Sequence, residues 1–384
     1  MKNILLLGAT GSIGDSVLDV IEQNKDKLNL YGMTFNSNFS KATEIANKHS
    51  PNFIYVEDEN HISDLKKSLS EASEILNGKA NLNLLIKDKN IDVIISAISG
   101  FAGLETTIIA AKTGKTILLA NKESIVVAGD LILPLAKENG TTIIPIDSEH
   151  NAIFQCLAGE NSTEDVSKII ITASGGPFLD KSLKDLVNVT KKEALKHPNW
   201  EMGSKISIDS ATLVNKCLEL IEAKYLFNLH ESFFQLVIHP QSIVHSIVTY
   251  RDGSSICQMS NPDMRVPISH ALSDSKRLSL NFSEIDFSSL NLSFCSFPED
   301  RNNLVSIARE VCNSGGSLGT VFNAANEVVV KSFLEDRIKF TDIYDIIYRT
   351  FDAIPMSNNL NIESIYEIDN ESRMEAEKMV KSVT

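Results

Sequence analysis

Two short polar runs, well separated in the sequence, contain the side chains best suited to metal chemistry. The first run, residues 147–151, contributes the carboxylates of Asp147 and Glu149, and the second, residues 215–219, contributes Glu219. Hard divalent cations prefer oxygen ligands, so these three carboxylates could converge on one ion. The same runs offer groups that could hold an oxygen-rich anionic ligand beside it: Ser148, Asn215 and Lys216.

The second run is predicted to lie on a helix that begins near Asp209 or Ser210, both good N-cap residues. At ~100° per residue, one arc of this helix is polar and consists of Thr212, Asn215, Lys216 and Glu219. Taken alone, this arc is also what the solvated face of an amphipathic helix looks like. Together with the first run, it favours a metal-dependent enzyme that acts on a sugar phosphate.

A glycine-rich turn near the start of the chain is a second, independent signal. An apolar run at residues 4–7 leads directly into Gly8, Gly11 and Gly14, and a helical stretch follows at residues 12–21. Glycines between a strand and a helix let backbone amides approach a pyrophosphate at the helix N-terminus. The spacing is GxxGxxG and not GxGxxG, and glycines at a turn can also serve tight packing alone. The context favours a dinucleotide cofactor.

The end of the predicted second strand, residues 28–35, bears on which dinucleotide is bound. An acidic residue there would grip the 2'-hydroxyl of NAD and repel the 2'-phosphate of NADP. Residues 36–41 contain no acid, which favours NADP. Ser37, Asn38 and Lys41 are candidate contacts to that phosphate, although an ordinary polar loop would have the same composition.

Composition excludes several classes of protein. The 384 residues include 50 acidic and 36 basic ones, for a formal charge of −14, which argues against a general nucleic-acid surface. Five scattered cysteines without a CxxC pair indicate neither a disulfide framework nor a zinc site, as expected for a reducing cytosol. We expect no targeting segment before the first strand and no membrane helix.

Short apolar runs alternate with helical patterns through the first 150 residues. Strands are predicted at residues 91–97, 116–119 and 142–146, with helices at 102–112 and 130–138 between them. This alternation is typical of an α/β fold with a Rossmann-like, doubly wound parallel sheet. Ligands of such sheets bind at the carboxyl ends of the strands. Residues 96–100, 120–123 and 147–149 should therefore face one crevice.

The remainder of the chain has a different pattern. A strand at residues 169–173 and a hairpin of residues 243–250 and 255–259 predict an α+β domain. A stretch rich in Ser and Asn separates it from helices at 304–311, 318–334, 341–351 and 363–380. We therefore expect a nucleotide-binding domain at 1–148, a catalytic domain at 149–277, a linker at 278–301 and a helical domain at 302–384.

Motifs extend along nearly the whole chain, at residues 8–14, 120–124, 147–155, 173–178, 197–203, 209–219, 238–242, 261–265 and 323–327. In this order they resemble the 1-deoxy-D-xylulose 5-phosphate reductoisomerase family. The resemblance implies rearrangement of 1-deoxy-D-xylulose 5-phosphate to an aldehyde, which NADPH reduces to 2-C-methyl-D-erythritol 4-phosphate in non-mevalonate isoprenoid synthesis. It also implies Mg²⁺, Mn²⁺ or Co²⁺ as the metal and a homodimer. From the composition described above, we expect a cytoplasmic protein with neither a nucleic-acid nor a membrane partner.

The resemblance assigns roles to individual residues. Asp147, Glu149 and Glu219 match the metal ligands, while Lys122, Ser148 and Glu149 match contacts to the reacting end of the substrate, with the catalytic base left open. The phosphate site is matched by Ser174, His197, Ser210, Asn215 and Lys216. Cofactor contacts are matched by Thr10, Gly11, Ser12, Ile13, Ser37, Asn38, Asn121, Glu123 and Gly203. Ser37 departs from the family, many members of which have a basic residue nearby, so the strength of the NADP preference is open.

Residues 197–204 resemble a mobile lid. The segment carries the chain's only tryptophan, Trp200, and we expect it to close with Met202 over the substrate while Gly203 lies near the nicotinamide. A structural tryptophan in a packed loop is the alternative. His150 is not expected to bind metal, His239 is expected to be a core residue, and residues 323–327 are expected to pack the helical domain.

Two other functions fit parts of the pattern. Another NADP-dependent enzyme, such as a sugar-phosphate or semialdehyde dehydrogenase, would share the nucleotide-binding fold, and a semialdehyde dehydrogenase would need a catalytic cysteine, for which none of the five has a clear context. A non-catalytic sugar-phosphate sensor could keep Lys216 and Ser174. It would have no use for three metal carboxylates together with Lys122.

Overall fold

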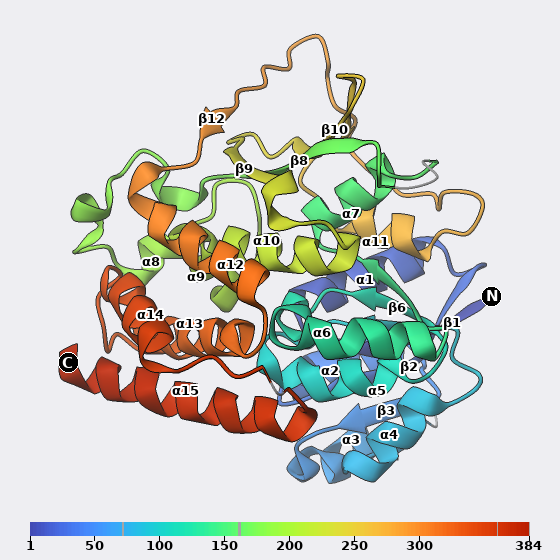
Figure 1. Cartoon of the computed structure of the whole chain (residues 1–384). Helices are drawn as coiled ribbons and strands as arrows, with labels where there is room; N and C mark the ends of the chain where they lie inside the picture. Colours follow the sequence, from blue (N-terminus) through green and yellow to red (C-terminus); the bar gives the residue numbers. More distant parts are fainter. Residues whose placement is uncertain (71–72, 160–162, 359, 384) are drawn as a thin grey trace. The chain divides into compact units, whose positions relative to one another are not determined.

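The computed structural model describes residues 1–70, 73–159, 163–358 and 360–383 (Figure 1). Contacts divide the chain into two compact units. The first unit consists of Met1–Asn121, Ile132–Asn151 and Met264–Ser283, and the second of Lys122–Leu131, Ala152–Asp263 and Glu284–Thr384. The four-part domain division expected from the sequence stays a prediction.

The first unit is built on a seven-stranded parallel sheet in the order β4-β3-β2-β1-β5-β6-β7. Its strands are β1 (Lys2–Leu7), β2 (Leu28–Phe35), β3 (Phe53–Val56), β4 (Glu74–Leu76), β5 (Val93–Ser96), β6 (Thr116–Leu119) and β7 (Thr142–Pro145). The strand order reverses direction beside β1, which confirms the predicted doubly wound α/β fold. Strands of such a sheet are covered on both faces, and Ile4–Leu7 of β1 are accordingly buried.

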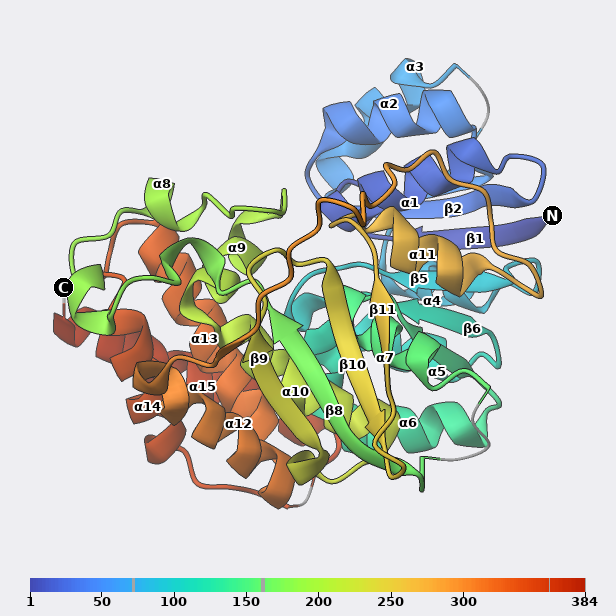
Figure 2. The ribbon, with the colours of Figure 1, turned by 90° about the horizontal axis from the view of Figure 1, so that it is seen from above.

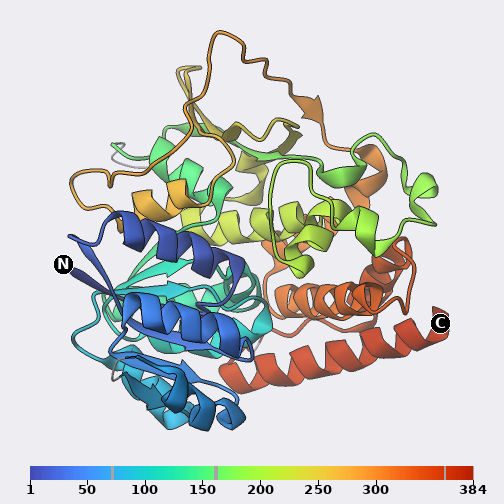
Figure 3. The ribbon, with the colours of Figure 1, turned by 180° about the vertical axis from the view of Figure 1, so that it is seen from behind.

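Helices cover both faces of this sheet, as the front and back views show (Figures 1 and 3). They are α1 (Ser12–Gln23), α2 (Phe39–His49), α3 (Ile62–Ser68), α4 (Lys79–Lys87), α5 (Leu104–Ala111) and α11 (Arg265–Leu272). Helix α11 comes from much later in the sequence than the others. Its Arg265 guanidinium donates a hydrogen bond to the Asp19 carboxylate of α1 at 2.7 Å. The first unit is therefore discontinuous in sequence.

The second unit contains a five-stranded sheet in the order β11-β10-β8-β9-β12, and Figure 2 shows its first four strands side by side. Its strands are β8 (Val166–Ala173), β9 (Phe234–Ile238), β10 (Val244–Tyr250), β11 (Ser255–Met259) and β12 (Cys295–Ser296). The hairpin of β10 and β11 is confirmed. Among the described strand pairs of this sheet, β8 and β9 are parallel and the others are antiparallel.

Helices make up most of the rest of the second unit. They are α8 (Lys191–Ala194), α9 (Ser204–Thr212), α10 (Val214–Phe227), α12 (Asn302–Ser314), α13 (Leu318–Leu334), α14 (Asp342–Ala353) and α15 (Ile362–Val383). Helix α13 is buried along most of its length and packs against α14 and α15. The predicted C-terminal helical region is confirmed.

Short 3-10 helices occur at η1 (Glu59–His61), η2 (Phe101–Gly103), η3 (Gly176–Phe178), η4 (Leu183–Leu186), η5 (Glu231–Phe233) and η6 (Glu299–Arg301).

Two helices contribute residues to both units, namely α6 (Lys122–Glu138) and α7 (Ser148–Cys156). Helix α6 begins eight residues before its predicted start at residue 130, and its backbone leaves helical geometry at Ala128 (φ −141°). Lys122 and Glu123 therefore lie in the first turn of a helix. Among the helices of the described residues, none is both long and apolar enough to cross a membrane.

The prediction of a helix starting near Asp209 or Ser210 is wrong. Helix α9 runs through both residues to Thr212, and α10 begins only at Val214. Between them Leu213 adopts a left-handed conformation with φ +66°. This conformation costs roughly 1–2 kcal/mol for a residue other than glycine, so neither composition nor periodicity signals the break. The Leu213 side chain is buried, and its burial offsets part of that cost.

The three glycines of the β1–α1 turn have different structural roles. A Cβ on Gly8 (φ +88°) would lie 2.7 Å from the Ala97 carbonyl oxygen, and one on Gly14 would lie 2.2 Å from the Ala9 carbonyl oxygen. A Cβ on Gly11 would meet only the Gly8 carbonyl oxygen, at an ordinary 3.5 Å. Packing therefore requires Gly8 and Gly14, whereas it does not explain Gly11.

We expect Gly14→Ala to lower the free energy of unfolding by roughly 3 kcal/mol, because its Cβ collides with rigid backbone and the helix must shift. Gly11→Ala, the matched control in the same turn, should change it by less than about 1 kcal/mol. Urea unfolding of both variants measures the difference. Equal losses at the two positions would contradict the assigned roles.

Candidate functional site

The N-terminus of α1 is the part of the first unit best suited to bind a dinucleotide. Gly11 is the N-cap residue, and no side chain caps the helix there. Gly11 and Ser12 are exposed, while Thr10 and Ile13 are half-buried. The first amide groups of a helix have no intrahelical acceptor and carry partial positive charge. Because β1 lies where the strand order reverses, this turn is at the expected ligand site of the sheet.

The three residues proposed to contact a 2'-phosphate differ in their local bonding. Asn38 caps α2, because its side chain accepts a hydrogen bond from the Lys41 amide at 3.2 Å. The Lys41 ammonium lies 2.6 Å from the Asp15 carboxylate. Ser37 is exposed in the turn before α2. Asn38 and Lys41 thus have structural partners, and Ser37 and Asn38 are both exposed.

Asn121 follows β6 and is buried. Its side-chain amide donates to the Ile98 carbonyl at 2.5 Å and to the Gly100 carbonyl at 2.8 Å. These bonds tie the ends of β5 and β6 together on the edge of the sheet where a ligand is expected. The Asn121 side chain therefore shapes the loop after β5.

The acidic run after β7 forms the start of α7. The Asp147 carboxylate accepts from the Glu149 amide at 3.2 Å and lies 2.9 Å from His150 Nδ1. The Ser148 hydroxyl donates to Glu149 at 2.6 Å. Asp147, Ser148 and Glu149 are half-buried, whereas His150 is fully buried. The structure thus brings these acidic and hydroxyl groups together at one helix terminus.

A second cluster lies in the second unit, around the carboxylate of Glu219 on α10. Its Oε1 accepts from Lys122 Nζ at 3.1 Å and from the Asn215 amide at 2.5 Å, while its Oε2 accepts from Lys216 Nζ at 2.5 Å. Lys122 also donates to Asn215 at 3.0 Å. Glu219 is 1% exposed and the two lysines about 5–6%. The polar arc of α10 is therefore an internal charged cluster and not a solvated helix face.

An adjacent ionic cluster was not found by sequence reasoning. Lys205, the second residue of α9, lies 2.6 Å from the Glu123 carboxylate and 2.8 Å from that of Asp209. Asp209 also accepts from the Asn326 amide of α13 at 2.8 Å. The only sequence signal was the i, i+4 spacing of Lys205 and Asp209. The Asn326 contact links α13 to α9, which lies outside the predicted helical domain of residues 302–384.

The pKa values of this cluster follow from burial and pairing. Burial opposes charge on Glu123, but the Lys205 ammonium outweighs it and lowers the Glu123 pKa. Burial also opposes charge on Lys205, yet its two carboxylate partners raise its pKa. Burial raises the pKa of Asp209, partly offset by Lys205. The Glu123–Lys205 pair is therefore charged at neutral pH.

Ser174 and His197 form a hydrogen-bonded pair at 2.8 Å. His197 Nδ1 accepts from the amides of Asn199 and Trp200, so in a neutral ring the proton is on Nε2, which donates to Ser174. The Ser174 oxygen also accepts from the Gly176 amide at 3.1 Å. With both bonds directed at the oxygen, the hydroxyl proton can be donated to a ligand.

The segment expected to form a lid is held at one end. Asn199 donates to the Pro240 carbonyl at 2.6 Å and to the Ser242 hydroxyl at 3.0 Å, and the Trp200 ring lies against His245. Met202 is half-buried, and Gly203 is the exposed N-cap of α9. Ser210, expected at a helix start, lies half-buried in the last turn of α9.

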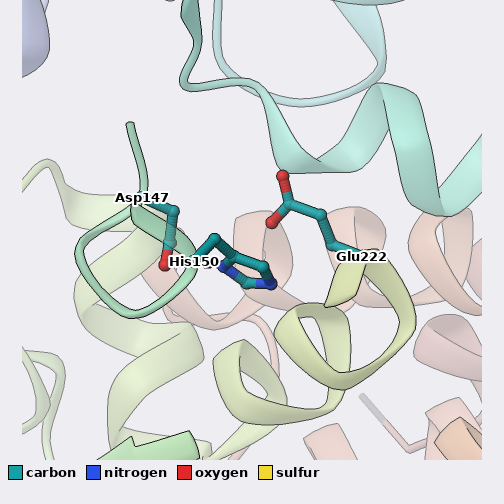
Figure 4. Close-up of side chains that lie close together, drawn as sticks. All are labelled: Asp147, His150 and Glu222. Carbon is teal, nitrogen blue, oxygen red and sulfur yellow. Dashed lines mark hydrogen bonds and ion pairs between the residues drawn. The ribbon is translucent and has the colours of Figure 1, made fainter. Parts of the chain in front are cut away.

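Two sets of side chains among the described residues offer the donors of a metal site. One is Asp147, Glu149 and Glu219, which matches the predicted set, and the other is Asp147, His150 and Glu222. Figure 4 draws the second set, in which Asp147 immediately precedes α7, His150 lies in the first turn of α7 and Glu222 comes from α10. The first set supplies oxygen atoms only, as hard divalent cations prefer.

The remaining candidates have structural roles. His239 is buried, accepts from the Ile243 and Val244 amides, and stacks on Phe294, as expected for a core residue. All five cysteines are free, and three are buried. Burial raises the pKa of Cys156 to about 11 and that of Cys312 to about 12, and it also raises the pKa of Cys217. These three thiols are poor nucleophiles at neutral pH.

Comparison with known proteins shows the same family along the whole chain. A model described as 1-deoxy-D-xylulose 5-phosphate reductoisomerase matches residues 4–129, and two models of the C-terminal domain of that enzyme match residues 143–227 and 259–375. The 1-deoxy-D-xylulose 5-phosphate reductoisomerase of Shewanella frigidimarina (strain NCIMB 400) is 42% identical, over all of both chains.

Solved structures agree. A crystal structure of DOX-P reductoisomerase in complex with NADPH, fosmidomycin and magnesium is 40% identical with a TM-score of 0.92, and the match covers 99% of this chain and 98% of the other. The Zymomonas mobilis enzyme in complex with NADPH is 41% identical with a TM-score of 0.90, covering 99% of each chain. The chain therefore belongs to the 1-deoxy-D-xylulose 5-phosphate reductoisomerase family.

Proposed function

We propose that this protein converts 1-deoxy-D-xylulose 5-phosphate to 2-C-methyl-D-erythritol 4-phosphate, using NADPH and a divalent cation. The buried Lys122–Glu219–Lys216 cluster carries the proposal, because it combines a candidate metal ligand with two ammonium groups suited to an anionic substrate. The solved relative with NADPH, fosmidomycin and magnesium binds the ligands that such a reaction requires.

Asp147, Glu149 and Glu219 would hold the metal. Their oxygen donors suit Mg²⁺, Mn²⁺ or Co²⁺, and the two oxygens of each carboxylate can accept more than one partner. When bound, the ion supplies Lewis acidity that polarises the substrate carbonyl and stabilises developing negative charge. The hydrogen bonds to Asp147 from the Glu149 amide and His150 orient its carboxylate within α7.

The substrate phosphate would bind Ser174, Ser210, Asn215 and Lys216, with His197 beside them. Ser174 has its hydroxyl proton available because its oxygen accepts from His197 and Gly176. The Lys216 ammonium offsets the phosphate charge. The helix near Ser210 ends at Thr212, so a helix-terminal amide that assists would come from the start of α10. The Val214 amide donates to the Thr212 hydroxyl and the Lys216 amide to the Leu213 carbonyl, so the backbone amide of Asn215 would be the one that assists.

At the reacting end, Lys122 can stabilise an oxyanion or transfer a proton, and Glu149 can accept a proton from a substrate hydroxyl. Lys122 is fixed for this role by Asn215 and Glu219, and Ser148 by its bond to Glu149. Their positions are set before substrate binds, which reduces the entropic cost of reaction.

The cofactor would bind at the start of α1, through Thr10, Gly11, Ser12 and Ile13. NADPH supplies the hydride that reduces the aldehyde intermediate. Ser37, Asn38, Asn121, Glu123 and Gly203 complete the proposed contacts. The space at Gly11, which internal packing does not require, is consistent with close approach of a pyrophosphate.

The rival functions have less support. A semialdehyde dehydrogenase needs a reactive thiolate, and burial raises the pKa of three of the five cysteines. A sugar-phosphate sensor would have no need for three metal carboxylates and a buried Lys122. A homodimer stays a prediction, which the mass of the purified protein in solution tests, and a cytoplasmic location stays one as well.

Incubation with 1-deoxy-D-xylulose 5-phosphate, NADPH and Mg²⁺ or Mn²⁺ should yield 2-C-methyl-D-erythritol 4-phosphate and oxidise NADPH only when metal is present. Mass spectrometry identifies the product. The specificity constant should be higher for NADPH than for NADH, because residues 36–41 contain no acid. Absence of this product with either metal would refute the proposed function.

Glu219→Gln should lower turnover by roughly two orders of magnitude and weaken metal activation, because the amide lacks the anionic oxygen that a hard cation prefers. Turnover against metal concentration, with circular dichroism to verify folding, measures the effect. Glu310→Gln changes an exposed residue of α12 and is the control. Turnover like wild type at low metal would remove Glu219 from the ligand set.

Closure of residues 197–204 should change the fluorescence of Trp200, the only tryptophan, when substrate or a phosphonate analogue saturates the protein. Its half-buried ring should lose contact with water as the segment covers the ligand. A fluorescence titration reports this directly. An unchanged spectrum at saturation would favour a structural tryptophan in a packed loop.

A further inference from the structure

We propose that Lys205 is a positioning residue that holds the first turn of α6, and with it the Lys122 ammonium, in place during the reaction. This inference rests on the function proposed above. It assigns a role to a side chain that touches neither substrate nor cofactor in that proposal and acts through Glu123 instead.

The first turn of α6 has two consecutive charged anchors within the second unit. Lys122 bonds to Asn215 and Glu219 of α10, whereas Glu123 is held by Lys205 of α9 at 2.6 Å. Because adjacent helical residues point in directions ~100° apart, the two anchors hold the turn from different sides. Rotation or fraying of the turn would break at least one of them.

Of these two anchors, only the Lys122–Glu219 contact includes a proposed metal ligand. Glu219, the carboxylate that accepts from Lys122, is also a proposed metal ligand, so it would serve both the ion and the ammonium group. The Glu123–Lys205 pair involves none of the proposed metal ligands. Lys205 therefore supplies a restraint on the helix turn that does not change when Glu219 engages the ion.

The Glu123–Lys205 ion pair is itself held in place by neighbouring groups. Lys205 lies between two carboxylates, and the second, Asp209, is fixed by Asn326 of the buried helix α13. Removing Lys205 would leave two carboxylates close together with little solvent to screen their repulsion. Glu123 is 7% exposed and Asp209 1% exposed, so neither can turn to water without moving the backbone.

Lys205→Met removes the charge while keeping side-chain length, and Lys205→Arg keeps the charge. We expect Lys205→Met to lower kcat by at least tenfold, to leave the NADPH dissociation constant within about threefold of wild type, and to be largely rescued in Lys205→Arg. The double variant Glu123→Gln/Lys205→Met tests whether Glu123 is the partner through which Lys205 acts. It removes the Glu123 carboxylate that Lys205→Met alone leaves buried without its cation. Its cooperative unfolding should be closer to wild type than that of Lys205→Met.

Lys331→Met is the matched control, since Lys331 is 74% exposed and lies 4.0 Å from Glu335. It should leave kcat unchanged. NADPH binding is followed by fluorescence titration without substrate, so it reports on each variant independently of turnover.

Two outcomes would overturn the inference. If kcat per folded enzyme is unchanged in Lys205→Met while only unfolding shifts, Lys205 is structural. If NADPH binding weakens while kcat at saturation is kept, Lys205 serves the cofactor contact of Glu123 and not Lys122. Failure of the proposed function is a separate result, because wild-type protein would then form no product.

Discussion

The site depends on a carboxylate held between two ammonium groups in the interior of the second unit. Glu219 and its partners Lys122 and Lys216 are each less than a tenth exposed, so their charges are tolerated only while all three remain paired. Pairing of this kind requires accurate placement of every contributing helix. The kinked start of α6 and the break between α9 and α10 place the three groups, and the packing around α10 and α13 keeps them there.

Much of the architecture follows from local pattern. The sequence predicts Leu28–Phe35, Thr116–Leu119 and Leu318–Leu334 with the bounds the structure has, because short apolar runs indicate strands buried on both faces and a long apolar stretch indicates a buried helix. The early start of α6 and the left-handed Leu213 were not predicted. Both are set by tertiary packing that outweighs local preference, and no glycine or proline marks either position.

The candidate site likewise contains residues that the sequence predicts and residues that it does not. Residues within one motif, such as Asp147–Glu149 or Asn215–Glu219, could be named from the sequence because their types and spacing restrict the chemistry. Lys205 could not, because a lysine near a helix start is usually a solvated surface residue. Its pairing with Glu123, 82 positions away, exists only once the helices are in place. Taken alone, the polar arc of α10 also has the composition of a solvated helix face, and only its combination with residues 147–151 favoured a site.

The break between α9 and α10 at Leu213 affects how the protein tolerates amino-acid substitutions at that turn. In one continuous helix the backbone amide of Asn215 would donate to a carbonyl of the preceding turn, whereas two successive helices place it at a second helix N-terminus inside the unit. Every residue except proline supplies a backbone N–H donor. Substitutions along that turn can therefore replace side chains and still leave a backbone donor, so this part of the proposed phosphate site would be encoded by backbone conformation and not by residue identity.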